Sequence, residues 1–390
     1  MLALTNGRIL TMAGKDFSRG TILIAEGKIK EVGDQVNISP EAEIIDLEGQ
    51  TVMPGLIDAH CHVGIAEEIY RIEGNDLNEY TEPVTPHLRA IDAVNPFDKA
   101  FQDARQGGVT TVCTGPGSAN IIAGESLVMK TYGQVVDKMV LRHPAGLKIA
   151  LGENPKRVYG DQKKMPATRM AIAALLRENL VKAQEYREKR KKGWEDPQKA
   201  PERDLRLESL VRVLEGEIPL RAHVHRADDI MTAIRISEEF QLPLVLDHCT
   251  EGYLICQEIA SRNIPVVVGP NLISRAKVEL QNNTFRNPGI LAGAGVKVAL
   301  MTDHPAIPVQ YLLICAALAV KEGMEEEEAL KAVTINAAEI LGVSSRVGSI
   351  EVGKDADLIV LDGSPLEIST QITKVFIEGQ LVFAEKNLGK

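Results

Sequence analysis

The strongest signal in this sequence is the segment Thr51-Val-Met-Pro-Gly-Leu-Ile-Asp-Ala-His-Cys-His62. Its apolar run predicts a strand, and His60 and His62 stand at the end of that run. Because side chains two residues apart on a strand point the same way, both imidazoles can face one divalent ion. The alternative is two unrelated histidines in a turn. It has little support, because three more metal-ligand candidates also follow apolar runs: His223, His248 and Asp303.

Composition limits the kinds of partner. The chain has 390 residues, 44% hydrophobic and 25% charged, so it can bury a large core. Its formal charge of −10 disfavours nucleic acid, which requires a basic surface. No uncharged apolar stretch is long enough to span a bilayer, and the first residues do not resemble a signal peptide. The five scattered cysteines disfavour a disulfide framework. We expect a cytoplasmic protein that acts on a small molecule, with no membrane partner.

Hydrophobic patterning divides the chain into two domains and predicts an α/β fold. Residues 1–53 and 353–390 contain short alternating runs, which predict one small sheet domain built from both chain ends. Residues 54–352 repeat an apolar run, a loop and a helical stretch, which predicts a parallel (β/α) barrel. The span 165–214 fits the barrel least. It has a helical period over 169–182 and a basic run over 186–192, which we interpret as a solvated helix face.

The later ligand candidates stand where barrel strands are expected to end. His223 follows 220–222, His248 follows 244–247, and Asp303 follows 298–302. Barrel enzymes build their active sites at this end of the barrel from several strands. Histidines with a carboxylate suit Zn²⁺ or a similar ion. One such histidine would indicate a polar core residue, whereas the whole set favours a metal centre.

Longer motifs at both ends of the barrel resemble one known family. The segments are Gly49 to His62, Thr334-Ile-Asn-Ala-Ala-Glu-Ile-Leu-Gly342, and Gly348-Ser-Ile-Glu-Val-Gly-Lys-Asp-Ala-Asp-Leu-Ile-Val360. They resemble the amidohydrolase superfamily over essentially the whole chain, with the imidazolonepropionase-related and prolidase-like branch as the nearest likeness. The resemblance implies a metal-dependent hydrolase with a (β/α)8 TIM-type barrel beside a small β-sandwich. It also implies a homo-oligomer.

The resemblance also implies ligand roles. His60 and His62 match the first-strand ligands of the family, His223 the fifth-strand ligand and His248 the sixth-strand ligand. Asp303 matches the eighth-strand aspartate, which would touch the metal and carry a proton from the attacking water to the leaving nitrogen. The implied metal is zinc, as one or two ions.

The fourth-strand position leaves three interpretations open. Lys148 resembles the lysine that several two-metal members carbamylate into a bridging ligand. Glu153 is the competing ligand, because it lies nearer the carboxyl end of the strand and needs no modification. In the third interpretation, Lys148 is an ordinary ion-pair residue beside a single metal.

Further residues are candidates for substrate contact. His225 is assigned to stabilising the substrate carbonyl or oxyanion, with a second-shell hydrogen bond as the alternative. Arg157, Tyr159 and Arg169 follow the fourth strand, and with Glu153 they form the expected substrate-binding group, in which arginines could hold a carboxylate. Surface salt bridges would explain these arginines equally well. The segment 114–120 is a weak anion-site candidate, and the loop 63–95 is a lid or an interface.

The residue three positions after His223 bears on the reaction. Aminohydrolases of the superfamily generally have a glutamate there, and this chain has Arg226. We therefore expect hydrolysis of an amide, a cyclic amide or a dipeptide. Deamination of a heterocycle or guanidine, with Asp228 as the acid, is the second hypothesis. A non-catalytic barrel is the third, and the complete set of expected ligands disfavours it.

Overall fold

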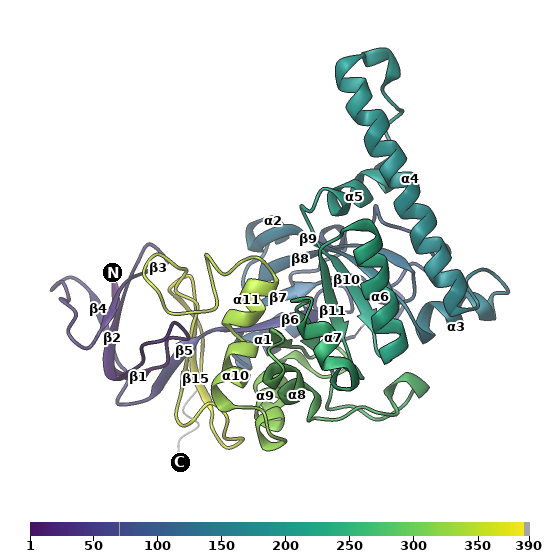
Figure 1. The fold of residues 1–390 in the computed structure, drawn as a ribbon. Coiled ribbons are helices and arrows are strands. Elements are labelled where there is room, and N and C mark those ends of the chain that lie inside the picture. The colour runs from purple at the N-terminus through teal and green to yellow at the C-terminus, as the bar shows by residue number, and fades with distance from the viewer. Residues whose placement is uncertain (70, 386–390) are drawn as a thin grey trace.

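The computed structural model describes residues 1–69 and 71–385, and these residues form two eight-stranded sheets. One sheet combines both ends of the chain, and the other curves into the barrel (Figure 1). This arrangement confirms the α/β class and the separate sheet built from the termini.

The terminal sheet has the strand order β16-β15-β14-β5-β1-β2-β3, with β4 paired to β1. The expected sandwich is thus built from one continuous hydrogen-bonded sheet. β5 lies between a strand from the start of the chain and one from its end, since it pairs parallel with β1 and antiparallel with β14. The strands are β1 (Leu2–Ile9), β2 (Phe17–Ala25), β3 (Lys28–Gly33), β4 (Glu43–Asp46), β5 (Thr51–Pro54), β14 (Leu358–Leu361), β15 (Ile372–Ile377) and β16 (Gln380–Ala384).

The barrel strands follow the order of the chain. They are β6 (Leu56–Cys61), β7 (Val109–Thr114), β8 (Ile122–Lys130), β9 (Val140–Ala150), β10 (Leu220–Val224), β11 (Leu244–His248), β12 (Val266–Val268) and β13 (Val298–Leu300). Backbone hydrogen bonds close the ring beyond β13, from His62 N to His304 O (2.9 Å) and from Asp303 N to His60 O (3.2 Å).

One barrel strand departs from the expected parallel arrangement. β8 runs antiparallel to both β7 and β9, while the other barrel pairs are parallel. Parallel neighbours need a crossover of a dozen or more residues, usually a helix. The connections 115–121 and 131–139 are too short for that, and the second holds only the single-turn helix α2 (Val136–Met139).

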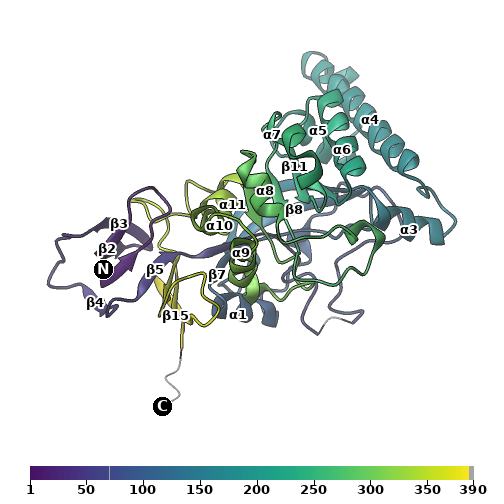
Figure 2. The same cartoon turned by 60° about the horizontal axis from the view of Figure 1, so that its bottom comes forward.

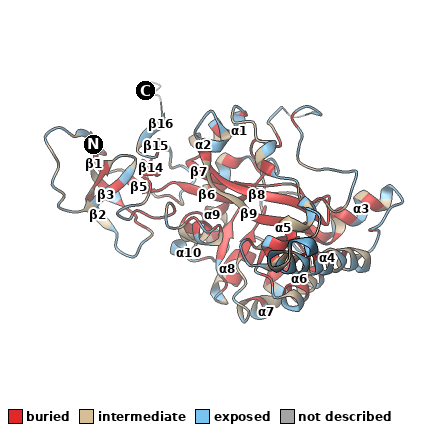
Figure 3. Cartoon of the chain, turned by 90° about the horizontal axis from the view of Figure 1, so that it is seen from above, coloured by how far each residue is buried: buried red, intermediate tan, exposed pale blue. Residues whose placement is uncertain are grey.

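The remaining helices cover the barrel (Figure 2). They are α1 (Lys99–Gln106), α3 (Glu153–Asp161), α4 (Arg169–Glu195), α5 (Leu205–Leu214), α6 (Ala227–Phe240), α7 (Cys256–Ala260), α8 (Asn287–Gly293), α9 (Leu312–Lys321), α10 (Glu326–Ala332) and α11 (Ile335–Ile340). α4 projects from the barrel, and its lysine-rich part is exposed, as predicted (Figures 1 and 3). The strands of the barrel are largely buried (Figure 3). No helix in the described ranges is long and apolar enough to cross a bilayer.

A buried ion cluster joins the barrel to the terminal sheet. Lys130, the last residue of β8, places its ammonium 3.0 Å from Asp355 Oδ2 and 2.5 Å from Asp357 Oδ2. Asp355 also pairs with Arg346 at 2.7 Å and with Lys28 at 3.0 Å. Since Lys130 and both aspartates are buried, each carboxylate depends on these cations for compensation.

Candidate active site

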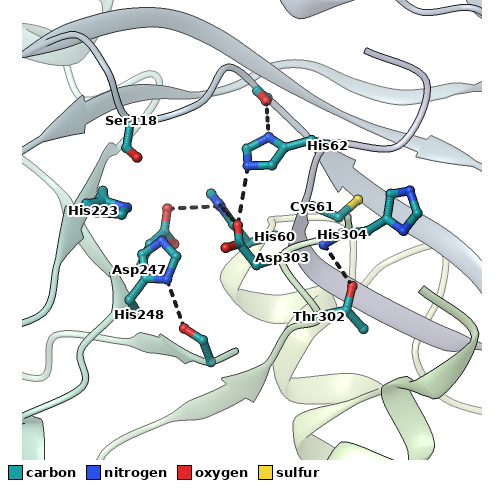
Figure 4. Close-up of polar contacts among 12 residues, drawn as sticks. His60, Cys61, His62, Ser118, His223, Asp247, His248, Thr302, Asp303 and His304 are labelled. Carbon is teal, nitrogen blue, oxygen red and sulfur yellow. Dashed lines mark hydrogen bonds and ion pairs between the residues drawn. The ribbon is translucent and has the colours of Figure 1, made fainter. Parts of the chain in front are cut away.

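Strands far apart in sequence bring the expected ligands together at one end of the barrel (Figure 4). His60 lies on β6 and His62 directly after it. His223 lies on β10, and His248 ends β11. Asp303 follows β13 and, like His248, has a left-handed backbone, with φ of 54° and 72° respectively. Such strain in non-glycine residues is typical of functional sites.

Two groups of three possible ligands form in this region. His60, His62 and Asp303 make up the first group, with Asp303 Oδ1 3.4 Å from His60 Nε2 and 3.3 Å from His62 Nε2. His223, His225 and His248 make up the second. Within each group the ligand atoms lie within 4.8 Å of one another. The structure therefore places His225, expected as a substrate contact, among possible ligands.

The outer nitrogens of these rings have partners. His62 Nδ1 lies 2.7 Å from Gly115 O, and His248 Nδ1 lies 2.8 Å from Gly269 O (Figure 4). Because a carbonyl oxygen only accepts, both Nδ1 atoms donate, and each Nε2 keeps a lone pair for a metal. His225 Nδ1 contacts Thr250 Oγ1 at 2.7 Å, while its buried Nε2 has no hydrogen-bond partner.

The protonation states also suit a metal. Burial, reinforced by the neighbouring imidazoles, holds the pKa values of His223 and His248 well below the usual range. Burial lowers the pKa of His225 to about 3. For Asp303, burial would raise the pKa, but hydrogen bonds with His60 and His62 hold it well below its usual range. Neutral imidazoles and an ionised carboxylate are the forms that bind Zn²⁺, so the donor set fits a divalent metal.

Lys148 on β9 lies beside the first group. Its Nζ is 3.1 Å from His60 Nε2 and 3.6 Å from Asp247 Oδ2. Burial lowers the pKa of this amine. Asp247 also lies 3.2 Å from His60 Nδ1 and receives a hydrogen bond of 2.7 Å from Arg221. Asp247 thus orients the His60 ring through Nδ1, while Nε2 faces Lys148 and Asp303.

The ligand groups line a cavity of about 380 Å³. Three loops complete its wall: 63–95 contributes Leu77 and Asn78, 115–121 contributes Gly117 and Ser118, and the segment after β12 contributes six residues between Pro270 and Leu280. This volume suits a small-molecule substrate.

The four residues expected to bind substrate are not among those that line this cavity. Arg157 is exposed on α3, and Arg169 pairs with Asp229 at 2.9 Å. The Tyr159 hydroxyl is buried and donates to Glu82 O at 2.7 Å. Glu153 is the first residue of α3, and its backbone N–H donates a hydrogen bond to Glu279 Oε2 at 3.0 Å. Of the two fourth-strand candidates, the structure brings Lys148 to the site and leaves Glu153 outside it.

Sequence reasoning missed four polar residues of the site. Asp247 and Arg221 pair inside the barrel. Each is a charged residue within an apolar strand, and this unusual position in the sequence could have marked it. Asn154 and Lys277 line the cavity, Asn154 from the start of α3 and Lys277 from the segment after β12. Lys277 lies in a loop without periodicity, so no pattern marked it.

Comparison with known proteins gives consistent matches. The sequence profile of the Amidohydrolase family matches residues 51–382. Amidohydrolase tasK of Hapsidospora irregularis is 30% identical over 93% of this chain, which spans about 40% of that protein's length. An imidazolonepropionase of Maricaulis maris is 27% identical over 98% of both chains. A 5′-deoxyadenosine deaminase of Methanobrevibacter smithii is 24% identical over 88% of this chain and 80% of its own.

Solved structures agree with this result. An amidohydrolase from Thermotoga maritima MSB8 superposes with a TM-score of 0.96 at 44% identity, covering 99% of this chain and all of the other. A prolidase complexed with N-methylphosphonate-L-proline has a TM-score of 0.64 at 20% identity, covering 98% of this chain and all of its own. The second match supports the fold alone.

Proposed function

This chain belongs to the amidohydrolase family and is an enzyme acting on carbon–nitrogen bonds, and on that premise we propose that it hydrolyses an amide, cyclic amide or dipeptide bond. The substrate is a small polar molecule. The observation that carries the proposal is the ionised Asp303, which lines the cavity together with both groups of histidines.

The proposed cofactor is zinc, as one or two ions. His60, His62 and Asp303 would hold one ion, and His223 and His248 the other, with His225 beside them. A bound ion supplies Lewis acidity, which polarises a carbonyl and makes a water acidic enough to attack near neutral pH. Lys148 is buried, and burial lowers the pKa of its amine, which favours the neutral form that carbamylation needs, so it is the proposed site of carbamylation.

The residues of the chain supply the proton transfers. Asp303 is ionised and reaches the cavity, so it can accept a proton from water and return it to the leaving nitrogen. His225 has an unpartnered Nε2 in the same wall. Its neutral ring can bind a metal or contact the substrate.

The scarcity of carboxylic acids in the cavity wall favours hydrolysis over deamination. Arg226 stands where a deaminase would carry its glutamate, and its guanidinium pairs with Asp228 at 2.9 Å. Among the described residues that line the cavity, Asp303 is the only carboxylic acid. The cavity wall therefore offers no second carboxylic acid to protonate a ring nitrogen; the buried Glu279, 3.6 Å from His225 Nε2, is not part of that wall. Since the relatives include both an imidazolonepropionase and a deaminase, their names do not choose between the reactions.

The proposal is tested by metal analysis and product analysis on the same protein. Purification without chelators, with zinc, manganese and bicarbonate supplied, should give about two metal equivalents per chain. Lys148→Met should lower this number. Secondary amides, lactams and dipeptides should be cleaved to a carboxylate and an amine. Ammonia release from heterocycles or guanidines, with no cleavage of any amide, would overturn the proposal.

A further inference from the structure

The loop after β12 places a second cation in the cavity wall. Of the described residues that line the cavity, only Lys148 and Lys277 carry a cationic side chain. Lys148 is buried against His60 and Asp247. Lys277 is different, because about a third of its side chain (32%) remains exposed.

The Lys277 ammonium has hydrogen-bonding capacity to spare. It has three donor hydrogens, and its one hydrogen bond within the described structure goes to Asn154 Oδ1 at 3.0 Å. The ammonium also forms an ion pair with the buried Glu279, whose Oε1 lies 3.6 Å away, but that contact is too long to use a donor hydrogen. Lys277 is therefore positioned by Asn154 and still able to bind an anion.

Asn154 connects this cation to the ligand groups. Its Nδ2 donates to Ser118 Oγ at 2.8 Å and lies 3.4 Å from His223 Nε2. One carboxamide thus separates the Lys277 ammonium from a candidate metal ligand. An anionic group bound at Lys277 would leave the rest of a small substrate beside the two ligand groups.

The net charge of the chain explains why an anionic substrate would need a cation at this position. The chain carries a formal charge of −10, so its overall field repels an anionic substrate. A local cation at the cavity overcomes that repulsion for a correctly oriented anion. Leu77, Ile273 and Leu280 supply an apolar part of the same wall.

The geometry points to Lys277, assisted by Asn154 and Ser118, as the recognition site for a carboxylate on the substrate. The substrate class is then an amide that carries a free carboxylate a few bonds from the scissile C–N bond and has an apolar portion. This inference rests on the proposed function for its reaction. It also replaces Arg157, Tyr159 and Arg169 as the expected carboxylate contacts.

The test compares matched acids and amides. The probes are N-acetyl amino acids, dipeptides and lactam carboxylates, each paired with the analogue in which the carboxylate is a primary carboxamide. The measurements are made on metal-loaded wild type, Lys277→Met, Lys277→Arg and the exposed-lysine control Lys164→Met. Dissociation constants come from titration calorimetry for probes that are not cleaved, and KM values from steady-state kinetics for probes that are. Metal content and melting temperature are recorded for each variant.

At least one acid should bind wild type more tightly than its amide. Lys277→Met should weaken binding of that acid by about 10- to 100-fold, the effect of losing a charged hydrogen bond. Lys277→Arg should retain part of the preference, and Lys164→Met all of it. Equal loss for acid and amide, or failure of every acid to bind at millimolar concentration, would overturn the assignment.

Product analysis separates the two proposals. If acids bind through Lys277 but no probe is hydrolysed, the carboxylate site stands and the proposed reaction fails. If acids and amides are cleaved with equal kcat/KM and Lys277→Met leaves that ratio unchanged, the reaction stands and the carboxylate site fails.

Discussion

Asp303 is the residue on which the proposed chemistry most depends. Its carboxylate touches both His60 and His62, and its pKa lies well below the usual range, so it is ionised at neutral pH and has oxygen lone pairs open to a proton. We expect Asp303→Asn to lower kcat by about 10²- to 10⁴-fold, the usual contribution of a positioned acid–base group. Steady-state kinetics with metal analysis would measure it. The exposed Asp161→Asn is the matched control, and an Asp303→Asn enzyme with full metal and full kcat would refute the role.

His62 tests the first ligand group. Its Nε2 is available to a metal because Nδ1 donates to Gly115 O. We expect His62→Asn to reduce bound metal by up to one equivalent per chain while the protein stays folded. The measurement is mass-spectrometric metal analysis beside circular dichroism. His87→Asn, outside the cavity, should keep the wild-type content, and a similar loss in both variants would contradict the assignment.

At this scale, the sequence predicted residues whose position follows from strand order. His60, His223, His248 and Asp303 converge because strand ends meet on one face of a barrel, a consequence of topology alone. Lys277 could not be predicted, because its place depends on the path of an irregular loop. Arg157 and Arg169 were expected near the substrate from their closeness to the fourth strand, but α3 and α4 direct them elsewhere.

At the scale of elements, the turn from β9 into α3 depends on Gly152. Its φ is +90°, and a Cβ there would lie 2.9 Å from Glu279 Oε2 and 3.1 Å from Asp229 Oδ2. We expect Gly152→Ala to destabilise the protein by about 1 kcal/mol more than Gly353→Ala, since crowding adds to backbone strain. Gly353 has the same φ with open space around it. Urea unfolding measures both, and equal losses would show that crowding contributes nothing.

The element pattern explains where sequence reasoning stopped. The strands at 220–224 and 244–248 were recognisable because compact apolar runs end in turns. β8 was missed, because its residues 122–130 are buried throughout and show no alternation. The short connections on either side of β8 require it to run antiparallel to its neighbours. Those connections can be measured only after the strand itself has been identified in the sequence.

At the scale of the whole molecule, Lys130 joins the two sheets. Lys130→Met would leave Asp355 and Asp357 buried without their shared cation, so we expect a loss of about 3–5 kcal/mol at pH 7. Denaturant unfolding would measure it. Lys182→Met, which breaks an exposed pair with Glu178, should change stability by no more than about 0.5 kcal/mol. A similar loss in both variants would show that burial of the cluster does not matter.

The same cluster predicts a pH dependence. Burial would raise the pKa of Asp355, but Lys130, Lys28 and Arg346 lower it overall. At Asp355 the folded state therefore binds fewer protons than the unfolded chain, whereas burial raises the pKa of Asp357 despite Lys130. The contribution of Asp355 is present above its unfolded pKa of about 4 and is lost as the pH falls through the lower folded value. Without Lys130 both carboxylates should take up protons more readily. The difference in the free energy of unfolding between wild type and Lys130→Met should therefore be smaller at pH 5 than at pH 7. A deficit independent of pH would argue against an electrostatic origin.

The terminal sheet can be completed only late in synthesis, because it joins strands from both ends of the chain. β5, residues 51–54, leaves the ribosome well before its neighbour β14, residues 358–361. At the usual rate of about 5–20 residues per second, the delay lasts roughly 15 to 60 s. Throughout this interval β5 has an unpaired edge and an apolar face, the features that invite aggregation. We therefore expect the nascent chain to be most prone to aggregation at this edge until synthesis reaches residue 361.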